Sequence, residues 1–404
     1  MKSVRLFALA LGVAIAGAIA AGFELLVRRV PSTTQLVRPE GSVEELYAER
    51  AKWAAAWDPA TAPPGRRHLP RFPIPESLGA QLFPIHNEMQ LWDELTYVRR
   101  PPNADFTFAF PEYPGGRIRF RTNALGLRES AEPMAGKPDL RVLVTGDSHT
   151  EGVCNNVESF PHVLRRALVR AHPGKTIECL NAGRGYFTFY SYLGTLEKYL
   201  DLAPDVFVVT VYAPNDFLEV VPLYHFFEGT PRTAGVSEYQ PLVDAILAKN
   251  EGFFSQGGGS LKFFQHYPSE IQVAMRAAKA AVLDIQELCE ARGIRLVFVV
   301  LPGFFDVERR KAAPDPAISD LERELDSMLE LGRSDVDLND RLGKELVDFL
   351  AERKIPCLDA HAVFDARPER LYWLGDHHMS TAGHAVLGEA LVPFVEALDS
   401  PGLR

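Results

Sequence analysis

The chain has 404 residues, with a hydrophobic content of 47% and a charged content of 24%, as in an ordinary globular protein. It is long enough for one large domain with extensions or for two modest domains. Its formal net charge of −10 at pH 7 argues against broad nucleic-acid binding, because that binding depends on clustered Lys and Arg. Composition therefore predicts a globular protein with a sizeable core that does not bind nucleic acid.

The N-terminus carries the first informative pattern. Lys2 and Arg5 precede an apolar run of 18 residues, Leu6 to Phe23, which is just long enough to cross a bilayer as a helix. Small residues at 20–22 allow a cleaved signal peptide, whereas the length of the run favours an uncleaved anchor over residues 1–30. In both cases we expect the body of the chain to be exported. The anchor would hold it at the cell membrane by a single span, on the periplasmic or extracellular side.

Two segments separate this anchor from the main domain. Residues 31–90 are rich in Pro, Ala and Arg and predict a linker with one short helix at about 43–57. Residues 91–136 predict a small β appendage. Within it, aromatic residues alternate along 106–110, and a Gly-rich turn and a second alternating run at 117–121 follow.

From residue 137 to 400 strands alternate with helices, which predicts a parallel sheet covered on both faces. Strands are expected at 141–146, 176–183, 206–211, 295–303 and 355–360. Helices are expected at about 160–168, 189–202, 269–291, 338–352 and 381–398. The rhythm breaks at about 218–268, where we expect an inserted loop that either covers the site or simply packs on the domain.

Polar residues gather where the expected strands end. The first strand runs into residues 146–152 (GDSHTEG), the second into 181–186 (NAGRGY) and the third into 212–216 (YAPND). After the last strand comes 375–384 (GDHHMSTAGH). Because sites in open α/β sheets form beyond the carboxyl ends of the strands, these four clusters predict one shared site.

The same residues resemble the SGNH (GDSL-type) hydrolase superfamily. The match covers about 140–398 and consists of GDS, N-x-G with a following glycine, an Asn-Asp pair and a C-terminal Asp/His pair, in that order. The segment Asn123–Arg128 is similar to one that precedes the catalytic domain of membrane-anchored bacterial members. The resemblance implies a three-layer α/β/α sandwich with a flavodoxin-like parallel sheet, and an enzyme that acts on ester bonds.

The chemistry explains the residue types. A serine hydroxyl is a poor nucleophile unless a base takes its proton. Ser148 is the expected nucleophile, and the resemblance makes His378 its base and Asp376 the group that orients the base. An oxyanion intermediate needs preorganised donors, and the resemblance assigns the Ser148 N–H, the Gly185 N–H and the Asn215 side-chain amide.

Three features depart from the family pattern. Asp376 lies two residues before His378 instead of three, which is similar to the alginate O-acetyltransferase-like branch. The loop at Gly185 is one residue short, which makes the N–H of Gly183 an alternative donor. The glycine usual before the Asn-Asp pair is Ala213.

The neighbouring histidines, His149 and His377, are expected either to support the catalytic residues or to face solvent. No ligand cluster predicts a metal or another cofactor. The four cysteines could pair in an exported protein, but buried free thiols are the favoured interpretation.

Three functions remain open at this point. The first is a serine esterase that acts through an acyl-serine on an envelope or extracellular ester, from a small molecule or a glycan. The second is an O-acyltransferase, such as an O-acetyltransferase, that uses the same triad to modify a cell-envelope glycan. The third is a catalytically silent envelope-assembly or glycan-binding domain.

Overall fold

A five-stranded parallel sheet lies at the centre of the computed structural model, which describes residues 43–54, 57–83, 89–230 and 236–397. These residues belong to one compact unit, 36–404. The anchor predicted at residues 1–30 lies outside the described residues. Among the helices that are described, none combines the length and apolar character needed to span a bilayer.

The strand order is β6-β5-β7-β8-β9, with every neighbouring pair parallel. The strands are β5 (Leu140–Thr145), β6 (Ile177–Asn181), β7 (Val206–Tyr212), β8 (Arg295–Leu301) and β9 (Cys357–Asp359). This is the flavodoxin-like order that was expected. The next strand in the chain after β5, β6, lies on one side of it, and the strand after that, β7, lies on the other side. The strand order therefore reverses between β5 and β7, and folds of this kind place their ligand sites at such a switch point.

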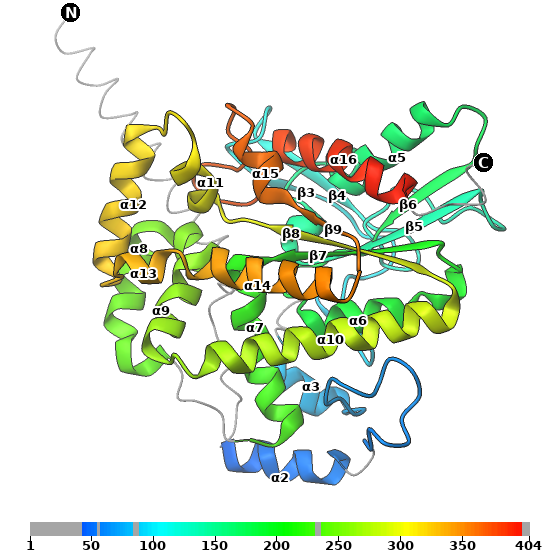
Figure 1. The fold of residues 1–404 in the computed structure, drawn as a ribbon, viewed down its shortest axis with the longest axis horizontal. Helices are drawn as coiled ribbons and strands as arrows, with labels where there is room; N and C mark the ends of the chain where they lie inside the picture. Colours follow the sequence, from blue (N-terminus) through cyan, green and yellow to red (C-terminus); the bar gives the residue numbers. More distant parts are fainter. Residues whose placement is uncertain (1–42, 55–56, 84–88, 231–235, 398–404) are drawn as a thin grey trace, which may run out of the picture. The chain divides into compact units, whose positions relative to one another are not determined.

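Helices cover both faces of the sheet (Figure 1). One face carries α6 (Phe189–Lys198), α7 (Ala213–Glu228), α10 (Glu270–Arg292) and α14 (Leu338–Glu352). The other carries α5 (Phe160–Ala171), α11 (Phe304–Arg310), α12 (Pro316–Met328), α15 (Ala360–Asp365) and α16 (Thr381–Glu396).

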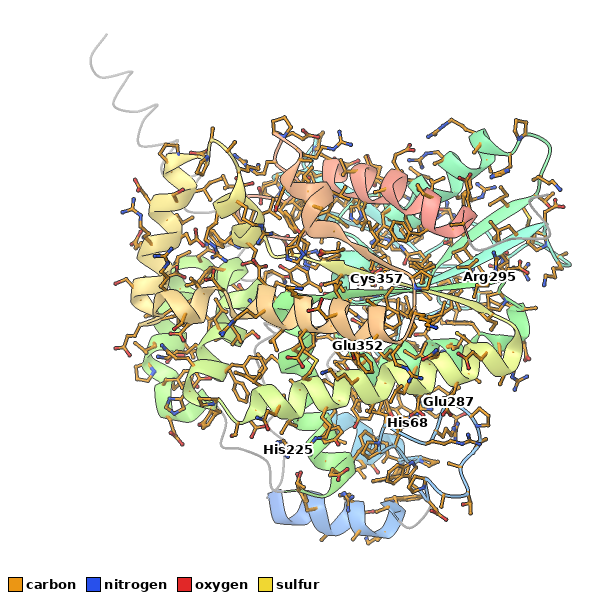
Figure 2. All side chains as sticks on the ribbon, viewed as in Figure 1. His68, His225, Glu287, Arg295, Glu352 and Cys357 are labelled. Atoms are coloured by element: carbon orange, nitrogen blue, oxygen red, sulfur yellow. The ribbon has the colours of Figure 1, made fainter. Side chains whose placement is uncertain are left out.

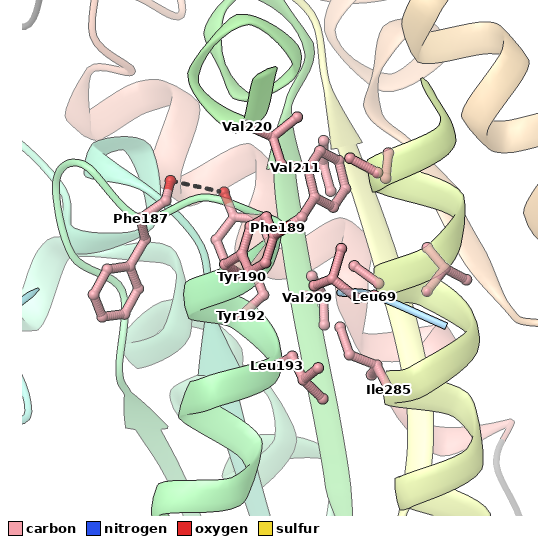
Figure 3. Packing of buried hydrophobic residues seen from close by; sticks show 14 of the residues in the cluster. Leu69, Phe187, Phe189, Tyr190, Tyr192, Leu193, Val209, Val211, Val220 and Ile285 are labelled. Carbon is pink, nitrogen blue, oxygen red and sulfur yellow. Dashed lines mark hydrogen bonds between the residues drawn. The ribbon is translucent and has the colours of Figure 1, made fainter. Parts of the chain in front are cut away.

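Each face has its own hydrophobic core, because successive side chains of a strand point to opposite sides. Along β5, Leu143 belongs to one core while Val142 and Val144 belong to the other. Figure 3 shows the first core, where aromatic side chains of α6 lie beside Val209 and Val211 of β7. Strands buried on both faces explain why their sequences are continuously apolar.

The prediction of an inserted loop at about 218–268 was wrong, because most of this segment is helical. α7 continues to Glu228, and α8 (Gln240–Phe253), a π-turn labelled η4 (Phe254–Gly258) and α9 (Gly259–His266) follow. α7 is buried around most of its circumference, so its sequence lacks the amphipathic period that marks a surface helix. α7 also contains Pro222, a residue that usually ends or kinks a helix.

The linker expected at 31–90 is also more ordered than predicted, in the part that the structure describes. α2 (Val43–Ala54) is the short helix predicted at about 43–57, but α3 (Glu76–Leu82) is a further helix, and Leu69 and Phe72 are buried in the core beside α10. The Asp284 carboxylate of α10 accepts the backbone N–H groups of residues 67, 68 and 69, at 2.8 to 3.3 Å. Pro and Arg between these apolar residues hid their burial in the sequence.

The remaining elements are short. Residues 91–121 form two antiparallel hairpins, β1 (Leu91–Asp93) with β2 (Tyr97–Arg99) and β3 (Asp105–Ala109) with β4 (Arg117–Arg121). Two further short helices are α4 (Ser148–Glu151) and α13 (Arg333–Val336). Single 3-10 turns lie at Asn156–Glu158, Leu200–Leu202 and Val236–Tyr239.

Candidate active site

The turn after β5 presents Ser148 as the first residue of α4. Asp147 caps this helix, because its Oδ1 accepts the His149 N–H at 2.9 Å. Burial raises the pKa of Asp147 to about 6. A Cβ on Gly146 would come within 2.1 Å of the Thr150 Oγ1, so the turn requires glycine there. The turn therefore holds the Ser148 hydroxyl at the carboxyl edge of the sheet.

Three of the predicted residues meet at this edge. The Ser148 Oγ lies 2.8 Å from the His378 Nε2, across 230 residues of sequence. The other ring nitrogen, Nδ1 of His378, lies 2.8 Å from the Asp376 Oδ1. With the proton on Nδ1 held by the carboxylate, Nε2 is free to accept the serine proton.

The two-residue spacing between Asp376 and His378 is accommodated by a tight turn. The Asp376 Oδ1 also accepts the backbone N–H of His378 at 2.9 Å, so one oxygen binds two donors of the same residue. His377, between them, has the left-handed φ of 63° that such a turn needs. His377 is buried against the rings of Phe304 and Phe305, so of the two positions expected for it, the solvent-facing one is excluded.

The electrostatics favour a base that gains a proton readily. Burial would lower the pKa of His378, but the Asp376 carboxylate outweighs it and raises that pKa above the ordinary value. Burial would likewise raise the pKa of Asp376, and His378 outweighs it, so the carboxyl pKa is lowered. The pair is therefore arranged to stabilise an imidazolium when the serine proton arrives.

His149 lies behind His378 and is also buried, so it does not face solvent. Its ring stacks on Tyr212 with centroids 3.7 Å apart, and on His378 at 4.9 Å. Its Nδ1 accepts the Met379 N–H at 3.3 Å, and its Nε2 lies 3.0 Å from the Gln256 Oε1. His149 therefore supports the ring of the base, as one of the two expectations had it.

Gln256 was not identified from the sequence. It lies in η4, its side-chain Nε2 is 3.4 Å from the His378 Nε2, and its backbone carbonyl accepts the Tyr212 hydroxyl at 3.0 Å. The segment was expected to be irregular, and a glutamine among glycines carries no recognisable chemical signal. Only the path of the insertion brings it to the site.

The predicted oxyanion donors have different surroundings. The Ser148 N–H and the Asn215 Nδ2 donate to no group of the described chain, and the Asn215 Oδ1 is buried without a partner. The Gly185 N–H, in contrast, donates to the Glu151 Oε2 at 3.1 Å, and the Gly183 N–H donates to the Asn181 Oδ1 at 3.0 Å. Ser148 and Asn215 are thus the predicted donors that remain available, while both glycine N–H groups are engaged.

Gly185 still lies beside the nucleophile, because a Cβ placed on it would be 3.6 Å from the Ser148 Cβ. The residue that occupies its N–H, Glu151, is the last residue of α4 and was not singled out in the sequence. Arg100 binds the Glu151 carboxylate with two hydrogen bonds, of 2.6 and 2.8 Å. Burial would raise the pKa of Glu151, but Arg100 outweighs it and lowers that pKa to about 2.

Two further arginines surround α4. The buried Arg128 guanidinium donates to the backbone carbonyls of Glu151, Gly152 and Cys154, which closes the C-terminal end of this short helix. Arg184 is also buried, and burial lowers its pKa to about 9. The floor of the site is therefore a fixed set of charges, in which a carboxylate lies among three guanidinium groups.

One group of possible metal ligands occurs among the described residues: His68, Asp284 and Glu287. Figure 2 shows His68 and Glu287 close together beside α10, and His68 Nε2 lies 2.9 Å from Glu287 Oε1. The Asp284 carboxylate is already occupied by the three backbone N–H groups described above. This group therefore forms a side-chain hydrogen bond and binds the backbone of residues 67–69. The four cysteines are free thiols, as favoured from the sequence.

No protein-family model matches the chain, and no curated protein matches it with significant sequence similarity. Among solved structures, it is similar to a GDSL-like lipase from Bacteroides thetaiotaomicron, with 14% identity, a TM-score of 0.34, and coverage of 64% of this chain and 89% of that one. A putative acylhydrolase from Bacteroides fragilis has 15% identity and a TM-score of 0.34, with 67% and 92% covered.

A catalytic mutant of an acetylxylan esterase from Geobacillus stearothermophilus has 15% identity and a TM-score of 0.36, with 67% of this chain and 99% of that one covered. At these identities and TM-scores, the likeness carries no inference about activity or substrate. The function is therefore derived from the geometry of the site.

Proposed function

We propose that this chain is a serine esterase that hydrolyses a carboxylic ester through an acyl-serine intermediate. One observation carries the proposal: the Ser148 Oγ, the His378 ring and the Asp376 carboxylate form a continuous chain of two 2.8 Å hydrogen bonds. A nucleophile within reach of a base, with the base oriented by a third group, is the arrangement that acyl transfer requires.

In the proposed reaction, Ser148 Oγ attacks the ester carbonyl carbon while His378 Nε2 takes the serine proton. The carbonyl oxygen becomes an oxyanion, which accepts hydrogen bonds from the Ser148 N–H and the Asn215 amide. When the intermediate collapses, His378 returns the proton to the departing alcohol and the acyl group stays on Ser148. A water then attacks the acyl-serine by the same steps in reverse order.

The test uses the full chain, p-nitrophenyl acetate as the ester and a fluorophosphonate probe for the serine. We expect turnover and labelling of the wild type, and neither with Ser148→Ala. The control is Ser327→Ala, an exposed serine at the end of α12, which should behave as the wild type. A wild-type chain that is folded but never labelled at Ser148 would contradict the proposal and support the catalytically silent domain.

An O-acyltransferase is the second candidate, because its reaction differs from that of an esterase only in the nucleophile that attacks the acyl-serine. A sugar hydroxyl of a cell-envelope glycan would replace water in the attack on the acyl-serine. The spacing of Asp376 and His378, which resembles that of the alginate O-acetyltransferase-like branch, favours this candidate. Incubation with an acyl donor and envelope glycans, followed by mass analysis of the glycan, separates transfer from hydrolysis.

We also propose that the reaction takes place outside the cytoplasm, at the membrane. The support is the apolar run at 6–23 with its preceding basic residues. Cell fractionation of the full chain and of a variant lacking residues 1–30 tests this. We expect the full chain in the membrane fraction, accessible to protease from outside the cytoplasm.

A further inference from the structure

The amide of Gln256 points at the place where the second half of the reaction must occur. We propose that Gln256 binds the attacking hydroxyl, of water or of an alcohol, and holds it against His378 while it attacks the acyl-serine. This inference rests on the proposed serine mechanism and adds a residue to it. Gln256 would then be a substrate-binding group supplied by the inserted segment.

The first step of the argument is the orientation of the amide. The His149 Nδ1 accepts the Met379 N–H at 3.3 Å, so its proton must be on Nε2. That proton faces the Gln256 Oε1 at 3.0 Å, which identifies this atom as the oxygen of the amide. The NH2 group is therefore the one that lies 3.4 Å from the His378 Nε2.

The second step is that His149 keeps this tautomer. Burial, reinforced by the neighbouring His378, holds the pKa of His149 well below its ordinary value. The ring remains neutral in the working range, with one donor and one acceptor. The Gln256 amide consequently cannot flip, with its oxygen and nitrogen exchanging places, without losing its hydrogen bond to His149.

The third step concerns the backbone that carries Gln256. Gly257 has a φ of 150°, which side chains of L-residues rarely allow, and its Cα approaches α7 so closely that a Cβ would lie 3.3 Å from the Pro214 Cβ. The Tyr212 hydroxyl holds the Gln256 carbonyl at 3.0 Å. The residue is only 6% exposed, so the position of its side chain is fixed from several sides.

The fourth step follows the protons. In the free enzyme the lone pair of His378 Nε2 accepts the Ser148 hydroxyl, at 2.8 Å, and 3.4 Å is too long for a second strong bond from Gln256. Once Ser148 is acylated it has no proton to give, and a new O–H must take its place at Nε2. An oxygen there can donate its proton to His378 and accept an N–H from Gln256 at the same time.

The bonds balance without a further reactant. The attacking oxygen forms a bond to the acyl carbon as its proton passes to His378 Nε2. The bond between the acyl carbon and Ser148 Oγ then breaks, and His378 returns the proton to Ser148. During acylation, the same N–H would stabilise the leaving group when that group is an alkoxide. p-Nitrophenolate is a stable anion and does not need this hydrogen bond.

The experiment compares full-chain wild type, Gln256→Ala and Gln256→Glu, with p-nitrophenyl acetate as substrate. Three quantities are measured: the rate of fluorophosphonate labelling at Ser148, the steady-state turnover, and the acetylated fraction of the protein by intact mass. With Gln256→Ala we expect labelling within about twofold of wild type, turnover lower by about tenfold or more, and accumulation of the acetyl-enzyme. The control is Gln265→Ala on α9, whose amide binds Glu330 and Asp335, and it should change none of the three.

Gln256→Glu separates two roles for the residue. It keeps an oxygen that can accept the His149 Nε2–H, but it has no N–H to offer the hydroxyl, so we expect it to accumulate acetyl-enzyme as Gln256→Ala does. Wild-type behaviour of Gln256→Glu would overturn the inference in favour of a role in positioning His149 alone. Unchanged turnover, or equal losses of labelling and turnover, would overturn it as well. A wild type that is not labelled at all would refute the proposed function itself.

Discussion

Removal of Arg100 should lower the free energy of unfolding, and the size of the loss can be worked out from the pKa of the Glu151 carboxylate. Arg100 binds Glu151 through two hydrogen bonds of 2.6 and 2.8 Å, and their side chains are 18% and 8% exposed. The pKa of Glu151 falls from 4.5 to about 2 in the folded chain. A difference of about 2.5 pKa units corresponds to about 3 kcal/mol of stability in favour of the charged carboxylate.

We therefore expect Arg100→Ala to lower the free energy of unfolding at pH 7 by about 3 to 5 kcal/mol, because it leaves a buried charge without its partner. Denaturant unfolding of the full chain measures this. Arg119→Ala is the matched control, since Arg119 and Asp105 form an equally close pair with side chains 59% and 38% exposed, and solvent screening leaves such a pair little effect on stability.

The pH dependence of the free energy of unfolding is a second test of the Arg100–Glu151 pair. The folded-state pKa of Glu151 is depressed, so its contribution is fully present above about pH 4.5 and is lost as the pH falls toward about 2. Arg100→Ala should flatten the stability curve in this window. If Arg100→Ala and Arg119→Ala lose the same small free energy, or if the curve keeps its slope, the assignment of Glu151 as a charge stabilised by Arg100 is refuted.

Two further predictions concern catalysis and a third concerns stability. Asp376→Ala should lower turnover by on the order of 10³-fold or more and, because Asp376 raises the pKa of His378, should move the acid limb of the pH–rate profile to lower pH; an unmoved limb contradicts this. Asn215→Ala should lower turnover of p-nitrophenyl acetate by about 10²- to 10³-fold with labelling still confined to Ser148, since it removes an available oxyanion donor; a loss below about threefold would exclude Asn215 from the oxyanion site. Gly257→Ala should cost about 1 to 3 kcal/mol in thermal unfolding because of its φ of 150°; wild-type stability would show that the turn relaxes freely.

The parts of the fold that could be predicted are those in which local pattern and burial agree. The strands β5, β7 and β8 are short apolar runs buried on both faces, and α10 and α14 have amphipathic patterns that mark their length. α7 could not be recognised in this way, because burial on nearly all sides removes the period and Pro222 suggests a break. Helices after β8, such as α11 and α13, are too short to show a period at all.

The residues of the candidate site also fall into two groups, those that the sequence pattern could locate and those that it could not. Ser148, Asp376, His378 and Asn215 could be located because each follows an expected strand or precedes an expected helix. The engagement of the Gly185 N–H by Glu151, and the approach of Gln256, depend on how distant segments pack. Neither residue stands in a motif, and only the folded chain brings them to the serine.

The tight turn at Asp376 places the Asp376 carboxylate and the His378 ring in one short segment of chain. The same pair of hydrogen bonds occurs between Asp359 and His361 at the start of α15, where the Asp359 Oδ1 accepts the His361 backbone N–H at 3.1 Å and lies 2.6 Å from the ring Nδ1. There the far nitrogen meets the Asp340 carboxylate at 3.0 Å instead of a serine. The hydrogen bonds that orient the His378 ring thus lie within three residues of chain, and only its contact with Ser148 depends on the packing of a distant segment.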